Sequence, residues 1–192
     1  MALVGILTAI EGIKSSLSSN FTNMGANSFT IRNSGMGIRM GGSGKRPKAF
    51  KKIELHEAEE FKRLFNFPAV VAISTFADGI AVARYQSEKT NPNINVMGVD
   101  ENYMTTSANS LEYGRNFSAT EVAQADNVVI IGSEVAAKLF KKTSAIDKVM
   151  IINNARYRVI GVLKEKGSSM GFGGDKMCLL SYLNVKQLYG NN

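Results

Sequence analysis

The sequence contains a single cysteine, a single histidine, no tryptophan and three prolines among its 192 residues. One cysteine cannot form a disulfide within the chain, so a disulfide framework is excluded and cysteine usage does not identify the redox compartment. A Cys/His zinc site needs about four ligands, which this composition cannot supply. Because activated nucleophiles and bases are equally scarce, the composition argues against a small enzyme.

Long apolar runs are also missing. No stretch of about 18 apolar residues occurs, so no segment of this sequence is predicted to span a bilayer. Residues 1–13, MALVGILTAIEGI, come closest. They lack a preceding basic region and a following small-residue cleavage site, so we exclude a signal peptide. We interpret the stretch as the tail of a longer apolar segment, with Met1 as the start codon.

The remaining composition is that of a globular protein, with 44% hydrophobic and 20% charged residues and a formal net charge of +7. The length suits one or two domains. Basic residues cluster over 45–52, where three interpretations stay open: a solvated loop, a contact with anionic lipid, or nucleic-acid binding. The solvated loop is favoured, because Phe50 is the only aromatic residue in the cluster and no recognition motif surrounds it.

The first 25 residues predict one long helix. Apolar residues recur at alternating three- and four-residue steps, as in a heptad seam. The seam consists of Leu3, Ile6, Ile10, Ile13, Leu17 and Met24. At about 1.5 Å per residue the helix would reach about 35 Å, more than a compact domain of this size needs. It is either an amphipathic helix packed on the domain or a projecting stalk.

The rest of the chain alternates short helical and strand patterns, which predicts an α+β fold in about two lobes. Glycine-rich segments at 33–48 and 167–175 predict exposed, mobile loops. Helices are expected at 55–66, 102–107, 119–125, 134–141 and 182–188. Strands are expected at 28–32, 70–75, 80–86, 94–99, 128–131, 148–153, 157–165 and 177–180, with turns at 78–79 and 153–155.

Several motifs match known chemistry only by letter. GKRPK at 44–48 lacks the spacing and the Ser or Thr of a phosphate-binding loop. GSSMG at 167–171 resembles a nucleophile elbow, but no histidine follows it. HEAEE at 56–60 lacks the second histidine of a metalloprotease, and Cys178 lies in an apolar run without a base. We therefore expect no catalytic residue, no cofactor and no metal.

Four segments in order resemble the periplasmic core domain of MacB-type ABC transporter permeases, within the MacB/FtsX/LolC superfamily. They are ILTAIEGIKSSLSSNFTNMGANSFTI at 6–31, INVMGVDENYM at 94–104, LEYGRNFSATEVAQADNVVIIGSEVAAKLF at 111–140 and ARYRVIGVLKEKG at 155–167. The resemblance implies a stalk helix at 1–25 that continues from a transmembrane segment. It further implies a porter-like lobe over 26–97, to which 176–192 return, and a sabre-like lobe over 98–175.

The resemblance also implies a function. Such domains couple cytoplasmic ATP hydrolysis to periplasmic conformational change for export, efflux, or the handling of lipoproteins and peptides, which is called mechanotransmission. It implies the periplasmic face of the inner membrane, a homodimer, a cytoplasmic ATPase domain or subunit and a periplasmic adaptor. No nucleic-acid partner is expected. The alternative is a free-standing extracytoplasmic module that binds a peptide or lipid.

The chain departs from the family pattern at its end, because family members continue past the position of Gly190 to complete the porter-like lobe. We interpret the sequence as a soluble piece of a larger membrane protein. On this interpretation the chain is monomeric or weakly dimeric, and deletion of residues 2–13 leaves both lobes folded.

Overall fold

The computed structural model describes residues 28–32, 52–107, 109–141, 143–166 and 175–190. The chain divides into two compact units, residues 1–69 and 70–192. The predicted helix at 1–25, the loop at 33–48 and residues 167–174 of the second glycine-rich loop lie outside the described residues.

The first unit contains helix α2, Leu55–Leu64, which confirms the helix predicted at 55–66. The backbone N–H of Glu54 donates to the Glu57 carboxylate at 2.9 Å, and basic residues occupy the last turn, as the helix dipole favours. The strand predicted at 28–32 is wrong, because the structure assigns no regular element there. Alternating polar and apolar residues are not enough for a strand, which also needs a neighbour to complete its hydrogen-bond ladder.

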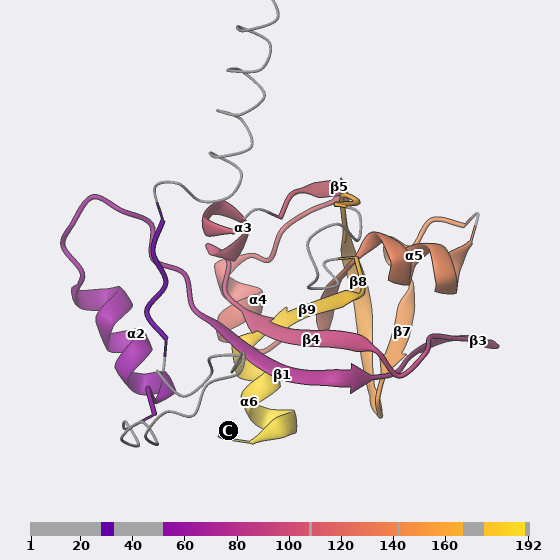
Figure 1. Cartoon of the computed structure of the whole chain (residues 1–192), viewed down its shortest axis with the longest axis horizontal. Helices are drawn as coiled ribbons and strands as arrows, with labels where there is room; N and C mark the ends of the chain where they lie inside the picture. The colour runs from indigo at the N-terminus through magenta and orange to yellow at the C-terminus, as the bar shows by residue number, and fades with distance from the viewer. Residues whose placement is uncertain (1–27, 33–51, 108, 142, 167–174, 191–192) are drawn as a thin grey trace, which may run out of the picture. The chain divides into compact units, whose positions relative to one another are not determined.

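The second unit is built on one mixed sheet (Figure 1). Its strands follow the order β1-β4-β9-β6-β8-β7-β2-β3, and β5 pairs with β8 off this path. The pairs β4–β9 and β6–β8 are parallel and the others antiparallel. The strands are β1 (Ser74–Ala81), β2 (Ala83–Tyr85), β3 (Glu88–Lys89), β4 (Ile94–Val99), β5 (Leu111–Gly114), β6 (Val128–Ile131), β7 (Val149–Ile152), β8 (Ala155–Leu163) and β9 (Met177–Ser181).

Two strands from distant parts of the sheet meet at Val82. This residue alone separates β1 from β2, which lie far apart in the hydrogen-bonding order. Asn153, in the turn between β7 and β8, closes the junction. Its side-chain oxygen accepts from the Val82 N–H at 3.2 Å, and its own N–H donates to the Val82 carbonyl at 3.0 Å.

The turn predicted at 78–79 is wrong. β1 runs through Asp78 and Gly79 as one strand paired with β4, with register shifts on both sides of Asp78. The Asp78 carboxylate accepts from the Ile80 N–H at 2.9 Å, which is local bonding typical of a turn residue. Here the ladder with β4 outweighs the local turn preference, and the two residues form an irregular stretch of strand.

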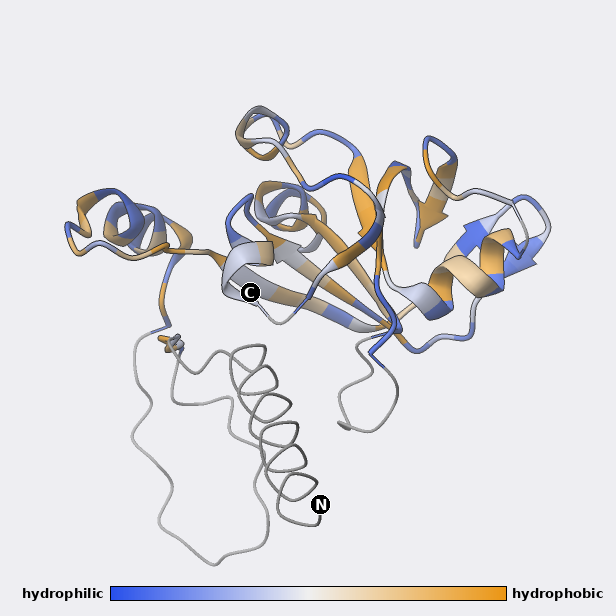
Figure 2. Cartoon of the chain, turned by 90° about the horizontal axis from the view of Figure 1, so that it is seen from above, coloured by the Kyte–Doolittle hydropathy of each residue, from blue (hydrophilic) through white to orange (hydrophobic). Residues whose placement is uncertain are grey.

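The described residues of this unit form four helices: α3 (Tyr103–Thr106), α4 (Ala119–Ala123), α5 (Ser133–Phe140) and α6 (Tyr182–Tyr189). Buried residues in the part of the unit that the structure describes form two clusters, one on each face of β6 and β9. Val129 and Ile131 of β6 belong to the cluster with α5 and α6, whereas Val128 and Ile130 belong to the cluster with α3 and α4. Burial on both faces explains the unbroken apolar runs of these strands. Figure 2 colours the chain by hydropathy and shows apolar stretches in orange.

Most predicted elements from residue 94 onward are confirmed with small shifts in their ends. The short strands β3 and β5 were not predicted, because runs of two and four residues carry too little periodicity. The division into a porter-like and a sabre-like lobe stays a prediction. The strands of both stretches are joined in one sheet, in which β4 and β9 pair with each other and β9 also pairs with β6.

Candidate functional site

The predicted seam, Leu3, Ile6, Ile10, Ile13, Leu17 and Met24, lies outside the described residues and stays a prediction. The loop motifs at 44–48 and 167–171 lie outside them as well.

The two residues with the most reactive side chains are not placed for catalysis. His56 lies in the first turn of α2 with a side chain that is 68% exposed, 3.2 Å from the Glu54 carboxylate. Cys178 is fully buried in β9, and burial raises the pKa of its thiol to about 12, so the thiol stays protonated at neutral pH. Among the described residues no cluster of three or more His, Cys, Asp or Glu could hold a metal ion.

A charged clamp organises the segment between β5 and α4. The Arg115 guanidinium donates two hydrogen bonds to the Glu121 carboxylate, at 2.8 and 2.6 Å. The backbone N–H and the hydroxyl of Ser118 donate to the same carboxylate at 2.9 and 3.0 Å, and the Glu121 N–H donates back to that hydroxyl at 3.2 Å. This capping box fixes the start of α4 and ties it to the end of β5.

The clamp keeps Glu121 ionised. The Arg115 hydrogen bonds and, to a smaller extent, the Ser118 donors together lower the pKa of this carboxyl to about 2, against the opposing effect of burial. At neutral pH the carboxylate has no proton to give, so it acts as a structural anchor. Gly114 precedes the clamp with a φ of 85°, and a Cβ there would overlap the Ile160 carbonyl oxygen of β8. Glycine is therefore required where β5 ends.

A second clamp fastens α6 to the body of the domain. The buried Asn184 side chain donates to the carbonyls of Ala125 and Asp126 at 2.7 and 3.0 Å and accepts from the Tyr157 hydroxyl at 3.3 Å. Burial raises the pKa of Tyr157 to about 12, so this donor stays protonated. Beside it, the Ser181 hydroxyl donates to the Val122 carbonyl at 3.1 Å. α6 is thus bonded to the segment between α4 and β6.

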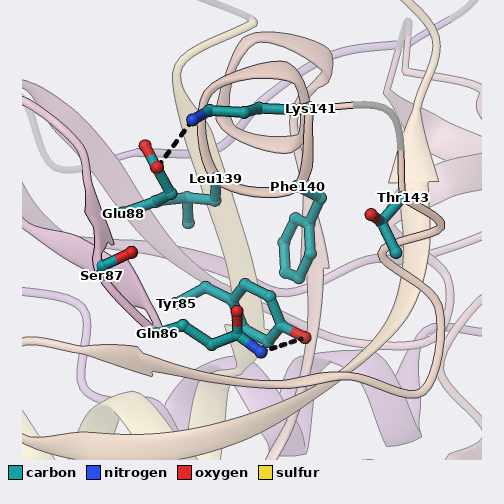
Figure 3. A pocket seen from close by; sticks show the side chains of 8 residues that line it. All are labelled: Tyr85, Gln86, Ser87, Glu88, Leu139, Phe140, Lys141 and Thr143. Atoms are coloured by element: carbon teal, nitrogen blue, oxygen red, sulfur yellow. Dashed lines mark hydrogen bonds and ion pairs between the residues drawn. The ribbon is translucent and has the colours of Figure 1, made fainter.

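An open pocket of about 430 Å³ lies between the β2–β3 turn and the end of α5 (Figure 3). The Tyr85 and Phe140 rings form an aromatic wall with their centroids 4.4 Å apart. At the rim, the Lys141 ammonium bonds the Glu88 carboxylate at 2.7 Å. The lining residues are Tyr85, Gln86, Ser87, Glu88, Leu139, Phe140, Lys141 and Thr143.

Among the described residues that line it, the pocket holds no group suited to proton transfer at neutral pH. The hydrogen bond from Lys141 lowers the pKa of Glu88, so this carboxyl is ionised at neutral pH and is already paired. Two residues of the lining, Gln86 and Lys141, have φ of 51° and 52°. Such backbone is costly for residues other than glycine and fixes the shape of the rim.

Sequence reasoning missed both clamps and the pocket. The Ser-x-x-Glu pattern at 118–121 is a capping-box signal and could have identified the first clamp. Nothing local marks Asn184 or the pocket, because their partners lie 27 to 59 residues away in the chain.

Residues 1–191 match the family of MacB-like periplasmic core domains. The chain belongs to this family. The resemblance found in the sequence is therefore confirmed, and the chain is a periplasmic domain of the MacB/YknZ type of ABC transporter permease.

Named relatives agree with this assignment. Over 192 residues the chain is 29% identical to the macrolide export ATP-binding/permease protein MacB of Bdellovibrio bacteriovorus, covering all of this chain and 29% of that protein. It is 34% identical over 95 residues to the uncharacterized ABC transporter permease YknZ of Bacillus subtilis, covering 50% of this chain and 23% of that one. The MacB-like domain thus spans less than a third of the length of these relatives.

Solved structures share the fold. The extracellular domain of a noncanonic ABC-type transporter, YknZ, from Gram-positive bacteria superimposes with a TM-score of 0.59 at 25% identity, covering 73% of this chain and 68% of that one. The periplasmic region of MacB from Actinobacillus actinomycetemcomitans superimposes with a TM-score of 0.69 at 20% identity, covering 90% and 73%. Within the described part of the MacB-like domain, no helix is both long and apolar enough to cross a membrane.

Proposed function

We propose that this domain relays conformational change between the membrane and the periplasm in an ABC permease. Cytoplasmic ATP hydrolysis drives this conformational change. The change serves export, efflux, or the handling of lipoproteins or peptides. The observation that carries the proposal is the family match over residues 1–191, together with relatives named as ATP-binding/permease proteins.

The construction of the second unit supports a relay. The sheet is buried on both faces at β6 and β9, and the clamps around Glu121 and Asn184 join the helices to it. Close-packed interiors transmit displacement with little compression. A unit built in this way moves as a body when one of its ends is moved.

The seam residues, Leu3, Ile6, Ile10, Ile13, Leu17 and Met24, are proposed to pack a stalk helix against the stalk of a second protomer. Heptad seams bury their apolar residues in this way. The permease is accordingly proposed to be a homodimer served by a cytoplasmic ATPase domain or subunit, with a periplasmic adaptor as a further partner. The porter-like lobe (26–97 with 176–192) and the sabre-like lobe (98–175) are proposed to move together with the stalk.

Cysteine cross-linking in the full-length permease tests the relay. The background is Cys178→Ser, and Ile10→Cys on the seam is compared with Ser15→Cys, which lies on the opposite side of the predicted helix. We expect cross-links between protomers at Ile10→Cys, with a yield that changes when ATP and vanadate trap the transporter. Equal cross-linking at both positions would contradict the seam. A yield insensitive to nucleotide would contradict the relay.

A further inference from the structure

Four cationic side chains share one face of the strands β3, β2, β7 and β8. Arg84 pairs with Lys89 on one side and with Ile151 on the other, and Ile151 pairs with Arg156. Residues paired directly across antiparallel strands point to the same side of a sheet. Arg158 lies two residues beyond Arg156 and is therefore on the same face.

This surface, the basic face, also includes two apolar residues of β7. Val149 pairs with Arg158 and is 54% exposed, and Ile151 lies beside it, half-buried. Arg84, Lys89, Arg156 and Arg158 are all exposed, and none forms an ion pair within the part of the chain that the structure describes. The basic face consists of Arg84, Lys89, Val149, Ile151, Arg156 and Arg158.

The opposite face of the same strands serves the core. Ala83, Met150, Ile152 and Tyr157 alternate with the cationic residues and belong to the buried cluster that includes α5. The cations therefore take no part in covering the face that packs against α5. They are also absent from the lining of the pocket beside α5.

Folding does not explain the arrangement. Arg84 and Lys89 lie directly opposite each other, and like charges in this position destabilise a sheet. Basic residues on an edge strand can prevent edge-to-edge association, which would account for Lys89 on β3. This explanation fails for Arg156 and Arg158, because β8 is an interior strand paired with β6, β7 and β5.

We propose that the basic face docks an acidic segment of a partner protein. Three of the four cations are arginines, whose planar guanidinium groups match carboxylates, and the two apolar residues of β7 suit the anchor position of a protein interface. Neighbouring strands are about 4.8 Å apart and alternate residues about 6.7 Å apart, so carboxylates along an extended chain meet the cations at comparable spacing. The proposal rests on strand register and does not depend on the transport function.

A membrane surface is the less favoured occupant. Insertion into a lipid interface uses exposed aromatic or long apolar side chains next to the basic residues. The basic face carries Val149 and Ile151 and no aromatic residue. Lipid binding is therefore an outcome that the test must distinguish.

The test measures binding of a fluorescent octapeptide that alternates glutamate and valine to the 192-residue chain. The double variant Arg84→Glu/Arg156→Glu is compared with Lys164→Glu/Lys186→Glu, which changes the net charge equally at exposed positions outside the basic face. We expect the first variant to weaken binding by about tenfold and the second by about twofold or less. Raising the salt from about 0.05 to 0.5 M should also weaken binding to the wild-type chain.

Three results would overturn the proposal. The two double variants could weaken binding equally, which would indicate general charge attraction. A peptide with glutamine in place of glutamate could bind as well as the acidic one. Vesicles of phosphatidylcholine with phosphatidylglycerol could bind in place of the peptide and lose binding in Arg84→Glu/Arg156→Glu. Circular dichroism of both variants checks folding, and Arg84→Gln/Arg156→Gln replaces the first variant if it does not fold.

Discussion

At the residue scale, the charge on Glu121 holds residues 115–121 in place. Its carboxylate is nearly buried and receives donors from Arg115 and Ser118. Arg115 is about half exposed, so the solvent screens part of the pairing. The hydrogen bonds to the buried carboxylate therefore contribute more to stability than the ion pair alone. A donor left unpaired near the core destabilises the folded state.

The substitution Glu121→Gln should destabilise the domain by about 2 kcal/mol, because a neutral amide cannot accept from all of these donors. Urea unfolding measures the change in the free energy of unfolding. Glu112→Gln on β5, where the side chain is exposed, is the control and should change little. Equal effects of the two substitutions would show that the clamp does not stabilise the fold.

The same carboxylate predicts a dependence of stability on pH. Its pKa falls from 4.5 to about 2 on folding, so the unfolded chain binds this proton at a higher pH than the folded chain does. The stabilisation is therefore complete above about pH 4.5 and is lost as the pH falls toward 2. The difference in unfolding free energy between the wild type and Glu121→Gln should shrink over this window. A constant difference would contradict the assignment.

At the scale of elements, α6 depends on one buried amide and on one close approach. Asn184 is 2% exposed and bonds the carbonyls of Ala125 and Asp126 as well as Tyr157. Gly98 of β4 lies where α6 begins, and a Cβ there would be 2.9 Å from the Tyr182 Cα and from the Thr75 methyl group. Polar bonding and backbone proximity together fix this helix on the sheet.

The substitution Asn184→Ala should cost about 3 kcal/mol, because it leaves buried carbonyls without donors and removes packed volume. Relative to the wild type, hydrogen exchange in this variant should become faster in α6 by more than it does in β6. Gln187→Ala, on an exposed position of the same helix, is the matched control. Unchanged protection of α6 in Asn184→Ala would contradict the role of the clamp.

The substitution Gly98→Ala should destabilise the domain by about 2 kcal/mol, since the added methyl group pushes α6 away from β4. Gly79→Ala provides the comparison within the neighbouring strand β1. A Cβ at Gly79 would meet only the end of the Phe76 ring at 3.2 Å and the Asn95 side chain at 3.5 Å, which can adjust. Thermal unfolding compares the stability of Gly98→Ala with that of Gly79→Ala. A larger loss of stability in Gly79→Ala would show that the close approach of α6 to β4 is not the contact most sensitive to an added methyl group.

At the scale of the molecule, we predict that the 192-residue chain is monomeric or weakly dimeric in solution. Dimerisation of the permease is proposed to depend on its membrane and ATPase parts, and the seam at residues 3–24 alone offers a short interface. Light scattering at micromolar concentration should give a mass near 20.8 kDa. A tight dimer under these conditions would show that the domain itself carries the main interface.

The sequence by itself determined the family, the α+β class and most of the elements after residue 94. The elements follow from local periodicity, and the family follows from segments such as residues 111–140 that occur in the family's order along the chain. It was misleading at 28–32 and at Asp78–Gly79, where local preference and hydrogen-bond pairing disagree.

Only the tertiary structure decided the junction at Val82, the clamp at Asn184, the pocket beside α5 and the basic face. In each case the residues come from distant parts of the chain, and strand register or helix packing sets which of them meet. Arg84 and Arg156 are 72 positions apart in the sequence (156 minus 84), yet both flank Ile151. A pattern of near neighbours in the chain carries no information about such pairing.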